Sequence, residues 1–266
     1  MQIPVIIDSV SGMETVARYN PALRFANPTL NPTALESDSP YSSEQNLVHF
    51  AQKRLKKLFT PAGAICLMGR EVGVGRSIAD LVLLIAPKRV PGLFVPSLSA
   101  AESVILASLR LRGPTRIDLL EVRCGFQSRG LRHGALERMV DAGILVRGRG
   151  GRVALKTNYV EAGRIIAIEA KLTKWREALN QATLYRRYAD EAHVLLPAQK
   201  AHPAIKARAE FTAAGVGLLI ATHKSITSVF TASPSTDHDW RRDFIYSRLL
   251  AKRREASTNG SASQSN

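Results

Sequence analysis

Several features that mark other classes of protein are scarce in this sequence. Its 266 residues include only two cysteines, Cys66 and Cys124, too few for a disulfide framework or a cysteine-rich metal site. No apolar run approaches the ~20 residues that a membrane span needs, and the N-terminus lacks the basic start and long apolar region of a signal peptide. The sequence therefore predicts a cytoplasmic protein that makes no membrane contact.

Acidic residues are also scarce relative to basic ones. The chain has 37 Lys and Arg against 22 Asp and Glu, a formal net charge of +15, and a pI near 10.3. Such an excess favours a polyanionic partner, with nucleic acid first and an anionic membrane surface second. If the partner is nucleic acid, the protein is expected to associate with the nucleoid. The alternative to a polyanionic partner is a basic surface that binds nothing.

The residue pattern divides the chain into four parts. Prolines with Asn and Ser predict an irregular N-terminal arm, and the Ser/Asn-rich C-terminus predicts a disordered tail. Between them, one segment interrupts an otherwise continuous α/β pattern. The predicted parts are an arm (1–40), a core in two pieces (41–97 and 158–251), an insertion (98–157) and a tail (252–266).

The core pattern alternates helices and strands. A helix is expected from Glu44 to near Thr60, because Ser42 and Ser43 offer N-caps and apolar residues recur at helical spacing. The stretches AICLMGRE and SIADLVLLIA then predict two strands around a turn. After the insertion, RIIAIEAKL predicts a strand, 174–190 a helix, and AHVLLP, GVGLLIAT and SITSVFTA further strands.

The insertion has the order of a winged helix-turn-helix, which it resembles. Three helical segments precede a basic hairpin, ILVRGRGGRVALKT, and residues 101–157 hold 11 Lys and Arg against 5 acids. In helix-turn-helix proteins the helix after the turn enters the major groove. A winged helix used for protein contacts is the alternative. The residues predicted to bind nucleic acid are Ser128, Arg129, Arg132 and His133 on that helix, and Arg147, Arg149 and Arg152 on the hairpin.

Charged residues inside apolar strands are the strongest indication of chemistry. Glu169 and Lys171 share one face of their strand with Ala167, because alternate strand residues point the same way. Buried charges are costly without partners, and a divalent metal with a phosphate would supply them. Asp80 is likewise the only charge in its strand. Two acids with a lysine predict metal-dependent phosphodiester hydrolysis, although a solvent-facing ion pair and a bulge-capping Asp are the structural alternatives.

These residues resemble the motif of the PD-(D/E)XK nuclease superfamily. Asp80 matches the first acid of the motif, and Glu169-Ala170-Lys171 matches (D/E)XK. Glu44 resembles the acid that many members carry on the first helix, although a helix dipole also favours a Glu there. Gln181 and Tyr185 resemble the QxxxY motif of RecB-like members; the alternative is a polar helix flank and a core aromatic.

The resemblance implies a restriction-endonuclease-like α/β core, with a mixed central sheet flanked by helices and the winged-helix domain inserted. It implies that Asp80, Glu169 and Glu44 hold Mg²⁺ or Mn²⁺, that Lys171 positions and polarises the attacking water, and that Gln181 and Tyr185 support the site. The chain departs from the family in the 89 residues between the two strand acids, which the insertion explains. Glu71 is a candidate extra or substitute acid.

The function expected from these residues is DNA phosphodiester hydrolysis, in restriction, defence, repair or a mobile element. Double-stranded DNA is the expected partner, and cutting both strands would call for a homodimer or a partner subunit. One alternative is a non-catalytic DNA-binding protein or regulator built on a degenerate nuclease core. Another is a protein-interaction subunit of a larger assembly, which the net charge of +15 disfavours.

Overall fold

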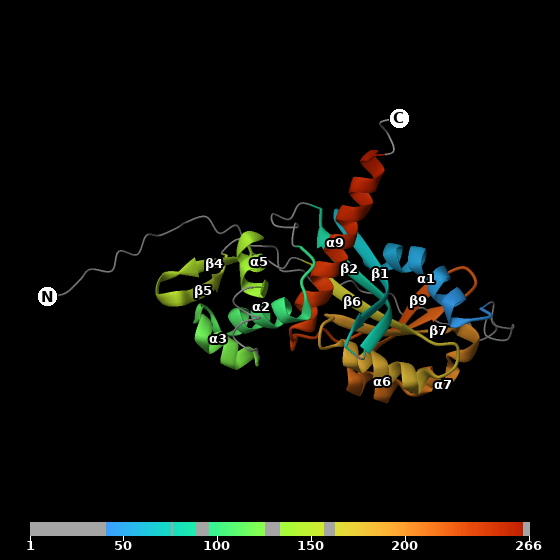
Figure 1. Cartoon of the computed structure of the whole chain (residues 1–266). Helices are drawn as coiled ribbons and strands as arrows, with labels where there is room; N and C mark the ends of the chain where they lie inside the picture. Colours follow the sequence, from blue (N-terminus) through green and yellow to red (C-terminus); the bar gives the residue numbers. More distant parts are fainter. Residues whose placement is uncertain (1–40, 76, 89–95, 126–133, 157–162, 263–266) are drawn as a thin grey trace.

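A computed structural model shows an α/β protein built on a mixed six-stranded sheet flanked by helices (Figure 1). It describes residues 41–75, 77–88, 96–125, 134–156 and 163–262, with no side-chain description beyond 251. The strand order is β1-β2-β6-β7-β8-β9, in which β6, β7 and β8 are parallel and the other neighbours antiparallel. The strands are β1 (Ala64–Val74), β2 (Ser77–Pro87), β6 (Arg164–Ala170), β7 (Glu191–Pro197), β8 (Gly217–Ala221) and β9 (Ile226–Phe230).

Helices cover both faces of this sheet, as Figure 1 shows. On one face lies α1 (Glu44–Phe59), whose buried stripe includes Leu47, Ala51 and Leu55. Ser43 is its N-cap and accepts a hydrogen bond from the Asn46 N–H, as the sequence predicted. The opposite face packs against further helices, which are α6 (Trp175–Tyr185), α7 (His202–Lys206), α8 (Arg208–Ala214) and α9 (Arg241–Ala262).

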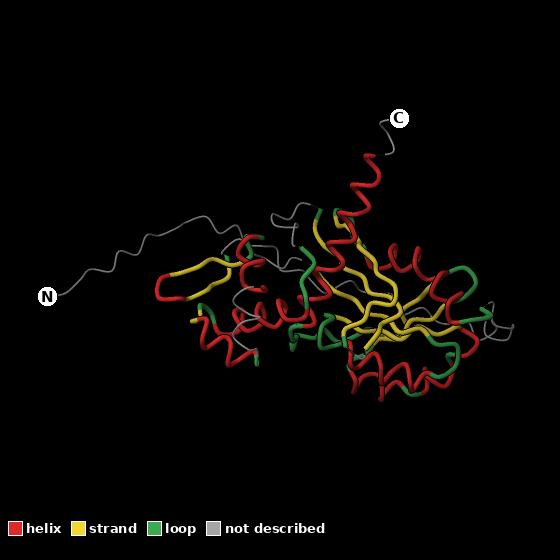
Figure 2. Tube along the Cα trace, in the orientation of Figure 1, coloured by secondary structure: helices red, strands yellow, loops and turns green. Residues whose placement is uncertain are grey.

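The insertion connects two strands that are neighbours in the sheet. The chain leaves after β2 and returns at β6, which pairs directly with β2 from Leu81–Ile168 to Ile85–Arg164. Between them, within the described residues, lie three helices and a second, three-stranded sheet of order β3-β5-β4, and Figure 2 shows this sheet apart from the main one. These elements are α2 (Ala100–Arg112), β3 (Thr115–Arg116), α3 (Ile117–Cys124), α5 (Leu136–Asp141), β4 (Leu145–Gly148), a 3-10 turn (Arg149–Gly151) and β5 (Arg152–Leu155).

The C-terminal third differs from the expectation in two places. No helix or strand was predicted between the β7 and β8 strands, where the structure has a 3-10 turn (Ala198–Lys200) and two short helices. The expected disordered tail at 252–266 is wrong for 252–262, because α9 continues to Ala262. The buried residues Ile245, Tyr246 and Leu249 anchor the start of this helix, and good helix formers such as Lys and Arg extend it.

Two other expectations concern the predicted arm and the helix after β6. The predicted arm, 1–40, lies outside the described residues. The helix predicted over 174–190 is shorter, Trp175–Tyr185, and ends in turns that return the chain to β7. Within the described part of the chain, no helix is long and apolar enough to cross a membrane.

Candidate active site

Asp80 and Glu169 face each other across adjacent strands. The register that pairs Leu81 with Ile168 places Asp80 opposite Glu169 at the next position. Asp80 Oδ2 accepts a hydrogen bond from the N–H of Ala170 at 2.7 Å, which closes the contact across 90 residues of sequence. The long separation of the two acids is therefore removed by the fold, because the whole insertion projects from one inter-strand connection.

The alternation predicted for β6 holds. Ile166 and Ile168 pack on the α1 side of the sheet and Ala167 packs on the α6 side. Glu169 is therefore directed to the α6 side, where its side chain is only 3% exposed. The Tyr185 hydroxyl lies 2.5 Å from Glu169 Oε2 and 2.7 Å from the carbonyl oxygen of Ile78, so both oxygens compete for its proton.

Burial gives the Glu169 carboxyl an unusual proton affinity. Desolvation and the negative charge of Asp80 raise the pKa of Glu169 to about 7, against the Tyr185 hydrogen bond and the Lys171 charge, which lower it. Burial also raises the pKa of Asp80, with smaller upward contributions from the charges of Glu44 and Glu71. Burial, with a smaller contribution from neighbouring negative charges, therefore favours the protonated forms of both carboxyls.

Lys171 follows the last residue of β6 and forms ion pairs with carboxylates of two elements, Glu169 of β6 and Glu44 of α1. Its Nζ lies 3.2 Å from Glu169 Oε1 and 3.5 Å from Glu44 Oε2, and its side chain is 14% exposed. Burial lowers the pKa of Lys171, but the surrounding carboxylates outweigh this and raise it, so the ammonium stays charged. Glu44, 46% exposed in the first turn of α1, reaches the site across 127 residues of sequence.

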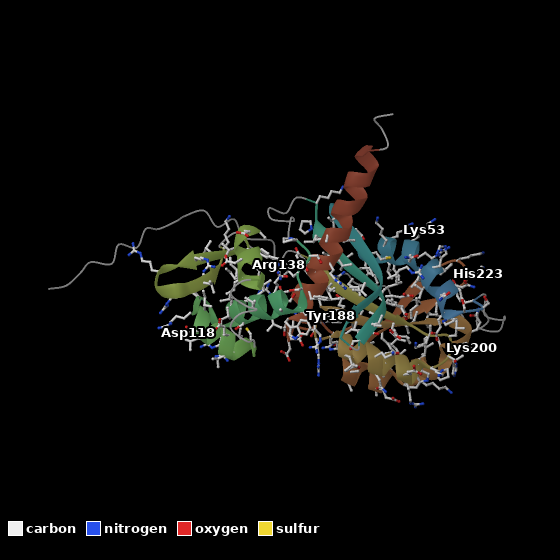
Figure 3. The ribbon with its side chains drawn as sticks, in the orientation of Figure 1. Lys53, Asp118, Arg138, Tyr188, Lys200 and His223 are labelled. Carbon is white, nitrogen blue, oxygen red and sulfur yellow. The ribbon has the colours of Figure 1, made fainter. Side chains whose placement is uncertain are left out.

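Gln181 lies one helical turn before Tyr185 on α6. Its Oε1 is buried and has no hydrogen-bond partner within the described structure. Tyr188 is a residue that the sequence reasoning missed: its hydroxyl is buried without such a partner, and burial and the charge of Glu169 raise its pKa. Its spacing of three from Tyr185 was the available signal. Figure 3 shows Tyr188 at the side of the sheet that faces the insertion.

Glu71 has an unusual backbone beside Asp80. The register places it between the pairs Arg70–Leu81 and Val72–Ala79, opposite Asp80, and its φ is 48°. Left-handed φ is uncommon for residues other than glycine. The side chain is exposed, and its charge reaches Asp80 strongly enough to raise that carboxyl's pKa.

The residues present fit a hydrated magnesium or manganese ion better than a closed metal cage. Across the described ranges, no group of three or more His, Cys, Asp or Glu side chains is placed to hold a metal ion. Mg²⁺, however, is commonly bound through one or two carboxylates with several retained waters. Asp80 and Glu169 are two such hard ligands, and a bound cation would offset the burial, and the smaller repulsion between carboxylates, that raise their pKa values.

The predicted nucleic-acid residues divide into two groups. Ser128, Arg129, Arg132 and His133 lie outside the described residues. On the hairpin, Arg147 forms an ion pair with Glu137. Arg149 and Arg152 are exposed, and within the described structure neither forms an ion pair.

Comparisons with known proteins assign no role to these residues. No model of a known protein family matches the chain, and neither does any curated protein. Among solved structures, it is similar to the SPO1766 protein of unknown function from Silicibacter pomeroyi, at 17% identity. The alignment covers 65% of this chain and 96% of that one, with a TM-score of 0.27, too low to bear on function.

Proposed function

We propose that the chain is a Mg²⁺- or Mn²⁺-dependent nuclease that hydrolyses DNA phosphodiester bonds with a PD-(D/E)XK-type site. The observation that carries the proposal is the position of Lys171. Its Nζ lies within 3.5 Å of carboxylates from two other positions, Glu169 and Glu44, while Asp80 contacts the same β6 backbone. The Lys171 ammonium and the two partly desolvated acids, Asp80 and Glu169, lie at one edge of adjacent strands. This arrangement suits a phosphate, which the ammonium would contact, and a cation, which the acids would bind.

Each residue has a role that follows from its contacts. Asp80 and Glu169 would hold the ion, which when bound would polarise the phosphate and favour hydroxide over water at neutral pH. Lys171 is positioned to stabilise the negative charge that develops on the phosphate and to orient the attacking water. Tyr185 donates to Glu169 Oε2 and fixes that carboxylate, while Glu44 holds Lys171 from the side of α1.

The insertion is proposed to act as a winged helix that binds the duplex. The three helices that the structure describes in the insertion, followed by a two-stranded antiparallel hairpin, suit that role, and the hairpin presents Arg149 and Arg152 without acidic partners among the described residues. Contacts from such arginines to phosphates give affinity with a steep dependence on salt, and base contacts would have to come from elsewhere in the module.

The test is cleavage of supercoiled plasmid and linear duplex DNA in Mg²⁺, Mn²⁺ or EDTA. Lys171→Ala should reduce metal-dependent cutting by at least ~10²-fold, as the loss of one transition-state charge contact does elsewhere. Binding of duplex in EDTA should be largely retained. Lys174→Ala is the matched control, because Lys174 is exposed and pairs only with Glu177 in the described structure. Full cutting by Lys171→Ala would refute the site assignment.

A second candidate is a DNA-binding protein whose nuclease core no longer cuts. The observation that favours it is the ion pair of Lys171 with Glu169 Oε1, which occupies an oxygen that a cation would need. This alternative predicts duplex binding that is indifferent to Mg²⁺ and no cutting by the wild type in any metal. Isothermal titration calorimetry with Mn²⁺ distinguishes the two candidates, because only the nuclease should bind Mn²⁺. In that case the Asp80→Asn variant should lose Mn²⁺ binding.

A further inference from the structure

One strongly cationic surface is left unused by the candidate site and by the hairpin. It consists of Lys53, Lys56 and Lys57 on the outer side of α1 and Lys224 in the β8–β9 turn, here called the α1 ridge. All four lysines are exposed, and within the described residues none of them forms an ion pair. Figure 3 shows Lys53 and the neighbouring His223 pointing outward on the α1 side of the sheet.

The folding of α1 accounts for only part of this charge. Lys56 and Lys57 lie in the last turn, where the helix dipole favours cations. Lys53 lies a turn earlier and one i,i+4 step from Lys57, and like charges at that spacing destabilise a helix. The only acid of the helix is Glu44, in its first turn. The ridge is therefore a concentration of charge that helix stability does not require.

The turn that supplies Lys224 is fixed to the helix. Arg54 donates to the carbonyl oxygen of Lys224 at 3.0 Å and stacks over the Phe50 ring at 3.6 Å from its centroid. The Tyr41 hydroxyl donates to the carbonyl oxygen of Thr222 at 2.5 Å. Two segments 170 residues apart are thus held as one surface, so the lysines have defined positions.

We infer that the α1 ridge binds the phosphate backbone of the DNA duplex beside the candidate active site. This inference rests on the proposed function. The same helix begins at Glu44, which contacts Lys171. At about 1.5 Å of rise per residue, Lys57 lies about 20 Å along the axis from Glu44. That distance corresponds to about six base pairs from the scissile phosphate, since each strand rises about 3.4 Å per base pair.

An anionic membrane is a poorer fit to the ridge. Helices that lie in a membrane interface insert an exposed apolar face beside their cations. The apolar face of α1 is buried against the sheet, and the large exposed hydrophobic residues of the described structure lie on other elements. A partner that needs only regularly spaced positive charge, such as duplex DNA, suits the ridge better.

The experiment compares two variants with the same loss of charge. Lys53→Ala/Lys57→Ala removes charge from the ridge. Lys200→Ala/Lys206→Ala removes it from exposed residues by α7, on the opposite face of the sheet. Binding of a fluorescent 30-base-pair duplex is measured by anisotropy in EDTA over a range of KCl concentrations. In the ridge variant, the slope of log Kd against log salt should fall by about 1.8, with binding about 60-fold weaker at 0.1 M salt. The α7 variant should match the wild type.

Three results would overturn the inference. They are an unchanged slope in the ridge variant, an equal loss in the α7 variant, and ridge-dependent binding to phosphatidylserine vesicles in place of DNA. Because the binding assay contains no metal, the measured slope is independent of cleavage. If the wild type does not cut DNA but the ridge variant still binds DNA with a lower salt slope, the nuclease proposal is refuted and the ridge inference stands. If cutting depends on Lys171 but the ridge variant binds like the wild type, the nuclease proposal stands and the ridge inference is refuted.

Discussion

Glu169 is the residue in which burial and charge conflict most directly. Its carboxyl is enclosed by Tyr185, Lys171 and the β2 strand, and desolvation with the charge of Asp80 raises its pKa to about 7. Because the folded-state pKa exceeds the unfolded value near 4.5, the folded protein holds this proton more tightly. The stability that Glu169 contributes is therefore complete below about pH 4.5 and is lost as the pH rises through about 7.

Replacing Glu169 by Gln should remove this dependence. In EDTA, the wild type should lose about 2–3 kcal/mol relative to Glu169→Gln between pH 4 and pH 8. Urea unfolding at several pH values measures the difference, and the exposed α6 carboxylate variant Glu177→Gln serves as the control. Parallel stability curves for Glu169→Gln and wild type would contradict the prediction.

At the scale of elements, α9 ties the insertion to the sheet. Arg110 of α2 forms a bidentate contact with the buried Asp243 of α9 at 2.6 and 3.1 Å. The backbone N–H of Leu98 donates to Ser247 Oγ at 3.0 Å. The helix also packs on β1 through Leu249, which lies beside Gly69. The insertion is thus attached to the core by more than its two chain connections.

Breaking this attachment should cost more than breaking an exposed ion pair of the same type. Arg110→Ala should destabilise the protein by about 2 kcal/mol, because it removes a charge partner from the buried Asp243. Arg116→Ala, which breaks the exposed pair with Asp118, should cost less than about 1 kcal/mol. Chemical denaturation compares the two; equal costs would mean that the α2–α9 contact is not a structural tie.

For the whole molecule, two cationic surfaces lie on different parts of the fold, the α1 ridge on the sheet and the hairpin at the far end of the insertion (Figure 1). Part of the positive charge of the chain thus lies on two surfaces that a duplex could contact. If one duplex contacts both surfaces, substitutions on both should lower the salt slope of DNA binding together. If each surface binds DNA separately, the combined variant should respond differently.

We expect the two surfaces to contribute additively to one complex. Arg149→Ala/Arg152→Ala should lower the salt slope by about 1.8, and the four-residue combination with Lys53→Ala/Lys57→Ala should lower it by about 3.6. Anisotropy titrations and the binding stoichiometry provide the measurement. A combined slope no lower than that of either pair, or two duplexes per chain, would show that the surfaces bind DNA independently.

Local residue patterns were enough for much of the core, and they singled out several residues that the structure brings together at the candidate site. Periodicity located α1, β1, β2, β6 and the hairpin, and alternation in β6 correctly assigned Glu169 and Ala167 to one face. It failed at α7, α8 and α9, whose short or weakly amphipathic sequences depend on contacts with distant strands. Tyr188 was missed for the same reason, since a buried hydroxyl near Glu169 is a property of packing.

The sequence by itself determined which residues carry unusual charge in apolar strands, because strand alternation and helical spacing are local rules that need no partner. Only the tertiary structure decided that Asp80 lies opposite Glu169, that Glu44 reaches Lys171, and that the turn of Lys224 joins α1. These contacts join residues 89 to 170 positions apart in the chain. They depend on which strands pair and which helix packs on which face, and the packing of the entire core sets that choice.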